Sequence, residues 1–186
     1  MSFFENTRKP VGLGGKIMVA MMNFGHSAMA EWGLSFLQTA PDAMVLDCGC
    51  GGGANIKTLL KLCPNGKVQG IDYSAVSVEK ARKVNARAIA AGRCTVQQAS
   101  VEELPFEAEQ FDVVIVSNAL HIVPQPEKSL REIKRVLKDD GVLIAPTFTH
   151  AENSLRGRIK AYFMRLAGFP LHSRWTSEEY LSFLRA

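Results

Sequence analysis

The chain has 186 residues, of which 47% are hydrophobic and 22% are charged, a balance typical of a globular protein. This length corresponds to one domain, so we expect no second hydrophobic core. The formal net charge of +4 is too small to indicate a nucleic-acid-binding protein. No apolar stretch approaches the roughly 18 residues of a membrane-spanning helix. Composition therefore excludes disordered, fibrous and membrane-spanning classes but indicates no function.

The N-terminal segment has an apolar run, Ile17 to Met22, and the sequence Ala28-Met29-Ala30 resembles a signal-peptidase site. We reject a signal peptide, because the run is short and its apolar positions continue at helical spacing through Trp32 and Phe36. An amphipathic helix explains the pattern. Residues 1–40 are therefore expected to form an N-terminal helical cap.

The four cysteines lack the spacing of a disulfide scaffold or of a zinc site, since Cys48 and Cys50 form a single C-x-C and Cys63 and Cys94 stand alone. We expect small residues packed beside the backbone, no metal, and a reducing cytoplasmic environment.

Strands and helices are predicted to alternate along the chain. The expected strands are 44–47, 68–72, 95–98, 113–116 and 142–145, the last one after an Asp140-Gly141 turn; the expected helices are 55–63, 74–91, 127–137, 154–166 and 177–184, with Ser74 and Thr176 as N-caps. Strands that are apolar on both faces and alternate with helices indicate a parallel sheet covered on both sides. We expect an α/β core over residues 41–150, with C-terminal helices of the same domain over 151–186.

A glycine-rich turn, Asp47 to Gly53, follows the first expected strand, and Asp72, Ser100 and Ser117 lie at or just after the ends of other strands. Ligands of open parallel sheets bind outside the carboxyl ends of the strands, so these residues are expected to share one crevice. The glycines allow a ligand to approach the backbone, and the following helix presents free N–H groups to a carboxylate or phosphate.

Two cofactors fit this turn, because Gly49, Gly51 and Ala54 also match the dinucleotide pattern G-x-G-x-x-A. A pyrophosphate would place negative charge near Asp47, whereas S-adenosylmethionine brings an ammonium that suits Asp47 and a carboxylate that suits the helix. Asp72, about twenty residues downstream, could bind ribose hydroxyls in either case. An NAD-dependent oxidoreductase would also need a sixth strand and usually a second domain, so it remains the less favoured alternative.

Several motifs in one order support the first cofactor. They are Val45-Leu-Asp-Cys-Gly-Cys-Gly-Gly-Gly, Gly70-Ile-Asp-Tyr-Ser, Val101-Glu-Glu-Leu-Pro-Phe, Phe111-Asp-Val-Val and Leu130-Arg-Glu-Ile-Lys-Arg-Val-Leu-Lys-Asp-Asp-Gly. In these the chain resembles class I S-adenosylmethionine-dependent methyltransferases, in particular the small-molecule group with a ubiquinone-biosynthesis-like core, over roughly residues 43–147. The resemblance implies a Rossmann-like sheet of about five strands in the order 3-2-1-4-5 and in-line methyl transfer to a small-molecule acceptor.

The resemblance also implies a cofactor site. Its expected members are Asp47, Gly49, Cys50, Gly51 and Gly53 at the methionine end, Asp72 at the ribose, Tyr73, Ser100, Val101 and Glu102 at the adenine, and the carbonyl of Ser117 near the sulfonium. The family commonly has an acidic residue at the position of Ser100. Since serine brings no charge, we expect the adenine contact to be weaker or shared with Glu102.

A catalytic base is optional for this chemistry, because the sulfonium already activates the methyl group. His121 is the candidate for accepting a proton from the acceptor, and the alternative is a packed or loop-ordering histidine. His26 and Thr147 are candidates for lining the substrate pocket, as is His150, although each could equally be a cap, turn or surface residue.

The last part of the chain departs from the family pattern. Similar enzymes add a C-terminal β-hairpin, which is missing here, so the strand at 142–145 would be an apolar edge that a partner chain or the tail covers. A homo-oligomer through this edge is possible. The first functional alternative is accordingly a truncated module that binds S-adenosylmethionine without turnover. The basic helix from Arg156 to Arg165 could bind an acidic membrane surface, but an ordinary solvated face is favoured.

Overall fold

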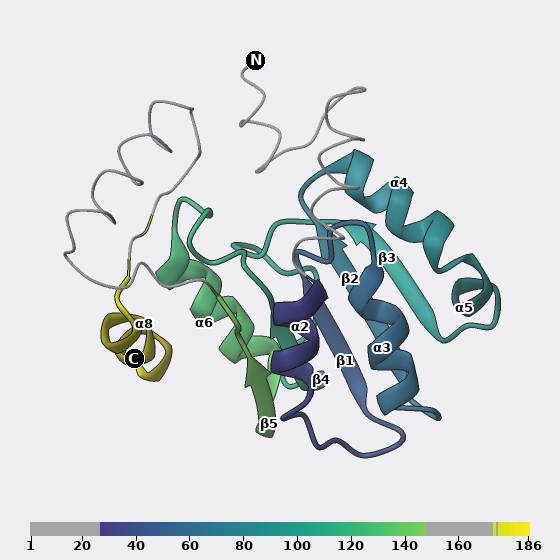
Figure 1. The fold of residues 1–186 in the computed structure, drawn as a ribbon, viewed down its shortest axis with the longest axis horizontal. Coiled ribbons are helices and arrows are strands. Elements are labelled where there is room, and N and C mark those ends of the chain that lie inside the picture. Colours follow the sequence, from purple (N-terminus) through teal and green to yellow (C-terminus); the bar gives the residue numbers. More distant parts are fainter. Residues whose placement is uncertain (1–26, 148–172, 174) are drawn as a thin grey trace.

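The computed structural model describes residues 27–147, 173 and 175–186, and its centre is a five-stranded sheet (Figure 1). The strands are β1 (Met44–Cys48), β2 (Lys67–Asp72), β3 (Cys94–Gln98), β4 (Phe111–Val116) and β5 (Leu137–Ile144). Their order is β3-β2-β1-β4-β5, and all neighbouring strands pair in parallel. The expected order 3-2-1-4-5 is therefore confirmed, and all carboxyl ends meet at one edge.

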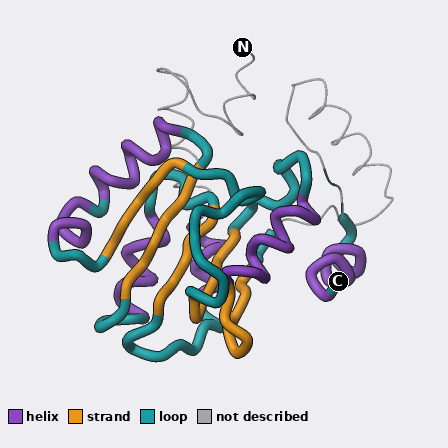
Figure 2. The backbone as a smooth tube through the Cα atoms, turned by 180° about the vertical axis from the view of Figure 1, so that it is seen from behind, coloured by secondary structure: helices purple, strands orange, loops and turns teal. Residues whose placement is uncertain are grey.

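Helices cover both faces of the sheet, as Figures 1 and 2 show from opposite sides. The helices are α2 (Ser27–Leu34), α3 (Ala54–Leu62), α4 (Ala75–Val84), α5 (Ala86–Ala90), α6 (Pro126–Val136) and α8 (Ser177–Arg185). Helices α2 to α5 contribute to the core on one face, whereas α6 and α8 contribute to the core on the other. Of the expected N-terminal cap, only α2 and the segment after it lie within the described residues.

Each strand supplies both cores because its side chains alternate between the two faces. On β1, Val45 belongs to the core beneath α2, α3 and α4, whereas Leu46 and Cys48 belong to the core beneath α6 and α8. All three side chains are at most 1% exposed. By the same alternation the side chain of Asp47 points to the face covered by α2, α3 and α4. The strand thus places an acidic residue in an apolar layer.

The expected helix over 74–91 is interrupted, which corrects the sequence prediction. Helix α4 ends at Val84 and α5 begins at Ala86, with Asn85 between them at φ −109° and ψ 17°. Ser74 caps α4 as expected, since its side chain accepts a hydrogen bond from the backbone N–H of Ser77. The interruption has a tertiary cause, described below, that no local pattern reveals.

Strand β5 begins earlier than predicted. Leu137 already pairs with Phe111, and pairing resumes only where Val142 lies opposite Val113. The four residues 138–141, which include the predicted Asp140-Gly141 turn, form an irregularity opposite the single residue Asp112. The strand therefore starts before this irregularity rather than after it.

Asp112 fixes this irregularity. Its Oδ1 accepts a hydrogen bond from Nζ of Lys138 at 2.6 Å, and its Oδ2 accepts one from the backbone N–H of Met44 at 2.7 Å. Partial burial opposes the charge, but the bonds to Lys138 and Met44 outweigh it and lower the pKa of Asp112 below its usual value. One carboxylate thus ties β4, β5 and the start of β1 together.

The C-terminal helix packs beside the end of β5. Its predicted cap is confirmed, since Thr176 Oγ1 accepts a hydrogen bond from the N–H of Glu179 and Glu179 Oε2 accepts one from the N–H of Thr176. The hydroxyl of Tyr180, whose pKa is raised by burial, donates to the carbonyl of Ala145 at 2.8 Å. The tail therefore covers part of this region, but Val142 on β5 remains 43% exposed. The expected basic helix at 154–166 lies outside the described residues.

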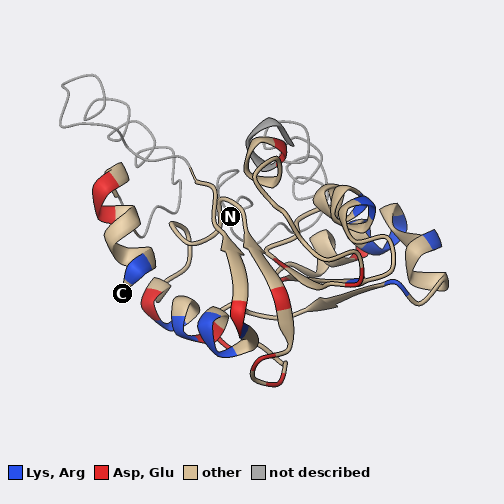
Figure 3. Ribbon diagram, turned by 90° about the horizontal axis from the view of Figure 1, so that it is seen from below, with Lys and Arg blue, Asp and Glu red and all other residues tan. Residues whose placement is uncertain are grey.

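Both acidic and basic residues occur along the ribbon of the described part (Figure 3). Within the same residues, no helix combines the length and the apolar character that crossing a bilayer requires.

The loop after β3 is fastened to α6 by Arg135. The guanidinium donates to the carbonyls of Phe106 and Leu104 at 2.8 and 3.0 Å, and it forms an ion pair with Glu132 at 2.8 Å. Glu132 in turn accepts a hydrogen bond from the N–H of Leu104 at 2.8 Å. These contacts hold the segment that leads away from the carboxyl end of β3.

Arg135→Ala should therefore destabilise the protein. Loss of hydrogen bonds from a charged, partly exposed donor is expected to cost about 1 to 2 kcal/mol, which corresponds to a fall of about 3 to 6 °C in Tm for a chain of this size. Thermal unfolding followed by circular dichroism measures the change. Arg131→Ala, at an exposed position of the same helix, is the matched control and should leave Tm within about 1 °C.

Candidate functional site

The predicted site residues gather at the carboxyl edge of the sheet. In the strand register Asp47 lies opposite Gly70 of β2 and opposite Ile115 of β4, and Asp72 lies opposite Gln98 of β3. Because Cys48 pairs with Val116, the following residues of β1 and β4, Gly49 and Ser117, also leave the sheet side by side. The register thus brings together residues that are far apart in the sequence.

The turn after β1 requires glycine at three positions. Gly49, Gly51 and Gly53 have φ values of 74°, 53° and 79°, in the left-handed region that L residues with side chains rarely adopt. Gly53 is also tightly enclosed, since a Cβ there would lie 2.5 Å from Nδ2 of Asn85 and 2.8 Å from Cβ of Ala81. Both backbone conformation and packing therefore exclude larger residues at Gly53.

Backbone hydrogen bonds join the turn to the end of β2. The N–H groups of Gly49 and Cys50 donate to the carbonyl of Ile71 at 2.9 and 2.8 Å. The N–H of Gly51 donates to Oδ2 of Asp72 at 2.9 Å, and the N–H of Ser74 donates to Oδ1 of Asp72 at 2.9 Å. Asp72 therefore links the glycine turn to the start of α4.

Asp47 is the most unusual group in the site. Its side chain is 1% exposed, and neither carboxylate oxygen has a hydrogen-bond partner. Burial, and secondly the charge of nearby Asp72, raise the pKa of Asp47 to about 7. Burial also raises the pKa of Asp72, although its bonds to the N–H groups of Ser74 and Gly51 oppose the shift. A cation placed at Asp47 would remove this penalty.

A second buried polar atom occurs at the end of the neighbouring strand β4. Oγ of Ser117 is buried with no hydrogen-bond partner, and strand alternation places it on the same face as Asp47. The next residue, Asn118, has φ 52° and its N–H donates to the carbonyl of Pro146 at 3.0 Å. The loop after β4 therefore leaves the sheet in a strained conformation, beside the glycine turn.

The loop after β4 also carries His121, which is connected to two other segments. Nδ1 of His121 and Oγ1 of Thr147 are 3.2 Å apart, a hydrogen bond whose direction depends on the tautomer of the ring. The carbonyl of His121 accepts a hydrogen bond from the N–H of Ser173 at 3.1 Å. The structure thus joins two residues that the sequence indicated separately. His26 and His150 lie outside the described residues.

On the β3 side, two predicted residues already have local partners. Oγ of Ser100 accepts a hydrogen bond from the N–H of Glu102 at 3.1 Å, and Oε1 of Glu102 accepts one from the N–H of Gln125 at 2.8 Å. Val101 is buried and 8% exposed. A contact between Glu102 and the adenine would therefore compete with the bond from Gln125. The sharing of the adenine contact with Glu102 stays a prediction.

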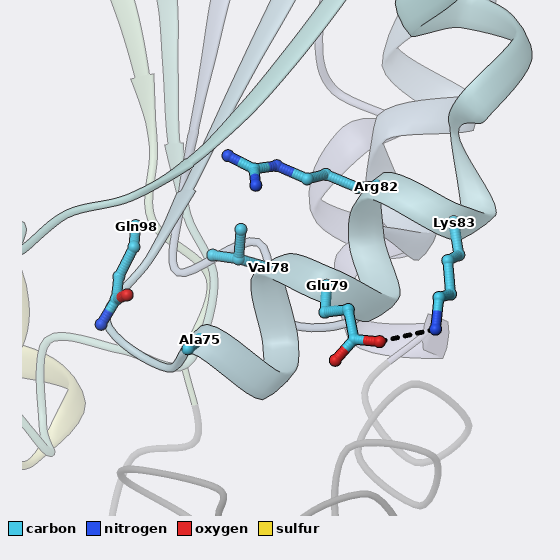
Figure 4. Close-up of a pocket in the computed structure, with 6 residues that line it drawn as sticks. All are labelled: Ala75, Val78, Glu79, Arg82, Lys83 and Gln98. Carbon is cyan, nitrogen blue, oxygen red and sulfur yellow. Dashed lines mark hydrogen bonds and ion pairs between the residues drawn. The ribbon is translucent and has the colours of Figure 1, made fainter.

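Tyr73 follows Asp72 and is 48% exposed, with its carbonyl held by Nε2 of Gln98 at 3.0 Å. Beyond Gln98, a groove of about 430 Å³ runs between α4 and β3. In this groove Nε of Arg82 donates to the carbonyl of Val96 at 2.8 Å, so the groove borders the outer side of β3 (Figure 4).

The cysteines are not arranged for chemistry or for metal binding. All four are free and buried, and burial followed by the charge of Asp47 raises the pKa of Cys48 and Cys50. A raised pKa disfavours the thiolate that would act as a nucleophile or a ligand. Within the described residues, no cluster of three or more metal-ligating side chains occurs.

A comparison with protein families decides between a methyltransferase domain and an NAD-dependent oxidoreductase. The family model described as a methyltransferase domain matches residues 40–184 of this chain. The chain belongs to this family.

Related methyltransferases resemble most of this chain. It is 30% identical over 162 residues to the mitochondrial 2-methoxy-6-polyprenyl-1,4-benzoquinol methylase of Caenorhabditis elegans, covering 86% of this chain and 55% of that protein. It is 27% identical over 157 residues to the 2-phytyl-1,4-naphtoquinone methyltransferase of Trichormus variabilis, covering 83% of this chain and 69% of that protein. The chain spans about half the length of several curated relatives that it matches.

The fold of this methyltransferase domain also occurs in solved structures. An S-adenosylmethionine-dependent methyltransferase from Aquifex aeolicus superposes with a TM-score of 0.65 at 20% identity, covering 82% of this chain and 87% of that one. At this level of identity the similarity concerns the fold alone.

Sequence reasoning missed two features of the site, the buried hydroxyl of Ser117 and the contact of Asn85 with Gly53. For Ser117 the resemblance indicates a role of the backbone carbonyl alone. For Asn85 a weak signal existed, because asparagine is a poor helix former in the middle of the expected 74–91 helix.

The unpaired carboxylate of Asp47 should make stability depend on pH. Because its pKa is raised from 3.8 to about 7 in the folded protein, the folded state binds more protons than the unfolded state between these values. Stability should therefore fall as pH rises from about 4 through 7, by about 1 kcal/mol per pH unit from this group. Asp47→Asn should raise Tm at pH 8, with a smaller gain at pH 5.5.

Thermal unfolding of the protein without added ligand, from pH 5.5 to 8.5, measures this effect. Asp42→Asn, at an exposed position, is the control and should keep the pH dependence of the wild type. A pH dependence that is the same in Asp47→Asn and in the wild type would show that Asp47 is not a buried, uncompensated charge.

Proposed function

We propose that the chain binds S-adenosylmethionine at the Asp47–Gly53 turn and transfers its methyl group to a small-molecule acceptor. The observation that carries this proposal is the Asp47 carboxylate, which is 1% exposed and has no hydrogen-bond partner on either oxygen. A buried, unpaired carboxylate favours a ligand that brings a positive charge. S-adenosylmethionine brings an ammonium group, whereas the pyrophosphate of a dinucleotide would add negative charge.

The amino-acid end of the cofactor fits this turn in two parts. Asp47 would bind the ammonium. Helix α3 begins at Ala54 without a side-chain cap from Gly53, so the N–H groups of its first turn can bind the carboxylate. Gly49, Cys50 and Gly51 would line this end with backbone only.

The adenosine end fits the ends of β2 and β3. Each oxygen of Asp72 accepts one backbone hydrogen bond, and the hydroxyl of Ser77 is a further partner, so the remaining acceptor capacity of the carboxylate can take the ribose hydroxyls. The exposed ring of Tyr73 would pack against the adenine, with Ser100 and Val101 at its edge. Ser117, on the opposite side of the turn, would lie near the sulfonium.

The bound cofactor supplies an activated methyl group, and the chain positions the acceptor and excludes water. We propose His121 as the group that accepts the proton of the acceptor, with Thr147 holding its ring through Nδ1. Both lie just beyond the carboxyl ends of β4 and β5, on the same edge as the glycine turn. His26 remains a proposed member of the acceptor pocket.

The acceptor is proposed to be an aromatic quinol or a related hydroxylated ring. Two relatives are a polyprenyl-benzoquinol methylase and a phytyl-naphtoquinone methyltransferase by name, which supports this class. Deprotonation of a ring hydroxyl would make the oxygen or the neighbouring carbon nucleophilic, and this gives the proposed base a role.

Location and assembly are also proposals. Four free cysteines agree with a reducing compartment such as the cytoplasm. The exposed apolar surface at Val142 agrees with a homo-oligomer through β5. Contact with a membrane surface through the 154–166 segment is the less favoured possibility.

Isothermal titration calorimetry with S-adenosylmethionine and S-adenosylhomocysteine tests the cofactor proposal. Both should bind the wild type, while NAD should not. Asp47→Asn should weaken both by about 100-fold or more, because the buried ammonium would lose its counter-charge. Equal binding by the wild type and the variant, or preferential binding of NAD, would contradict the proposed site.

A turnover assay separates an enzyme from a binding module. Labelled S-adenosylmethionine is incubated with short-chain benzoquinols and naphthoquinols, and methylated products are identified by mass spectrometry. Binding without product on this panel and on a mixed small-molecule extract would favour the module that holds the cofactor without turnover.

On the acceptor identified in that assay, His121→Ala should lower kcat by about 10²-fold or more while leaving the Kd of S-adenosylmethionine within about threefold. Thr147→Val should lower kcat less and shift its pH profile, and Thr147→Ser should restore both. Unchanged turnover in His121→Ala would show that this histidine only orders its loop.

A further inference from the structure

Asn85 lies outside the expected cofactor contacts but is joined to the glycine turn. It sits between α4 and α5 and is 3% exposed. Its Nδ2 donates two hydrogen bonds, one to the carbonyl of Gly53 at 2.9 Å and one to the carbonyl of Ala81 at 3.0 Å. The bond to Gly53 connects the turn to the end of α4 across 32 residues of sequence, whereas the bond to Ala81 is local, four residues back along α4.

The bond to Gly53 orients the first N–H group of helix α3. Gly53 and Ala54 share one planar, trans peptide, in which the carbonyl and the N–H point in opposite directions. Since Asn85 holds the Gly53 carbonyl on the side of α4, the N–H of Ala54 must point away from α4. Gly53 has no side chain that could cap this group.

The chemistry of Asn85 indicates that its contact with Gly53 is the reason for its presence. Oδ1 of Asn85 is buried with no hydrogen-bond partner, which an alanine or leucine at this position would avoid. Asparagine also interrupts the helix between Val84 and Ala86. An unpaired oxygen and a broken helix both disfavour folding, and they accompany the two bonds of the side-chain amide, of which only the one to the carbonyl of Gly53 reaches another segment.

We propose that Asn85 is a positioning residue for the amino-acid end of the cofactor, acting through the Gly53–Ala54 peptide and touching no ligand atom. This inference rests on the proposed function, because it requires a carboxylate at the N-terminus of α3. The positioning role of Asn85 concerns the amino-acid end of the cofactor and not its adenosine end. The adenosine end depends on Asp72 and Tyr73, neither of which Asn85 contacts in any hydrogen bond described above.

The test compares two ligands that differ only in the end that Asn85 serves. S-adenosylhomocysteine carries the amino-acid group, whereas 5′-methylthioadenosine lacks it. In Asn85→Ala the Kd of S-adenosylhomocysteine should rise about tenfold, while the Kd of methylthioadenosine should stay within about twofold. Titration calorimetry well below Tm gives both constants.

Arg93→Ala is the control for general destabilisation, since its guanidinium donates to the carbonyls of Leu60, Cys63 and Gly66 near the starts of β2 and β3, at the edge of the sheet opposite the site, and it should change neither Kd. The amide resonance of Ala54 gives an independent readout and should shift in Asn85→Ala, while the amides of β4 should not. If Asn85→Ala does not fold, Asn85→Ser, which keeps one donor, should show the same ligand pattern with a smaller change.

Each outcome separates the two proposals. If the wild type binds neither ligand, the proposed function itself fails. If the wild type binds both and the Asn85 variants weaken both ligands equally, or weaken neither, then the positioning role is overturned while the proposed function stands.

Discussion

The parallel pairing of β1 with both β2 and β4 is the constraint on which the rest of this structure depends. It buries β1 on both faces, and it delivers Asp47, Asp72 and Ser117 to one edge of the sheet. The chain must then turn sharply over the end of β2, which requires glycines with positive φ at positions 49, 51 and 53. Without this pairing the acidic residues would be separate surface groups with ordinary chemistry.

Several features that oppose folding are concentrated around this turn. They include the unpaired carboxylate of Asp47, the buried hydroxyl of Ser117, the free Oδ1 of Asn85 and the positive φ of Asn118. Elsewhere the described core is apolar and its loops are held by satisfied contacts, such as those of Asp112 and Arg135. A ligand bound at the turn can compensate for the unpaired groups of Asp47 and Ser117, and such groups are typical of a binding site.

The two halves of the proposed site differ in how they are built. The cofactor half consists of a turn, one helix N-terminus and strand ends, all held by backbone hydrogen bonds to β2 and by Asn85. The acceptor half combines the loop after β4, Thr147 after β5 and Ser173 near the C-terminal helix. Its geometry therefore depends on distant segments, which allows the acceptor to vary while the cofactor half stays the same.

The sequence by itself determined the α/β class, the five strands, their order by resemblance, and the acidic and glycine residues of the turn, because periodicity and turn chemistry are local properties. Only the tertiary structure decided the rest. The expected 74–91 helix is interrupted at Asn85, where the side-chain amide of Asn85 binds the carbonyl of Gly53. Strand β5 starts at Leu137, where it pairs with Phe111. The tertiary structure also buried Asp47 without a partner and joined His121 to Thr147. Burial and contacts between distant segments are properties of the assembled layers, so no local pattern could have revealed them.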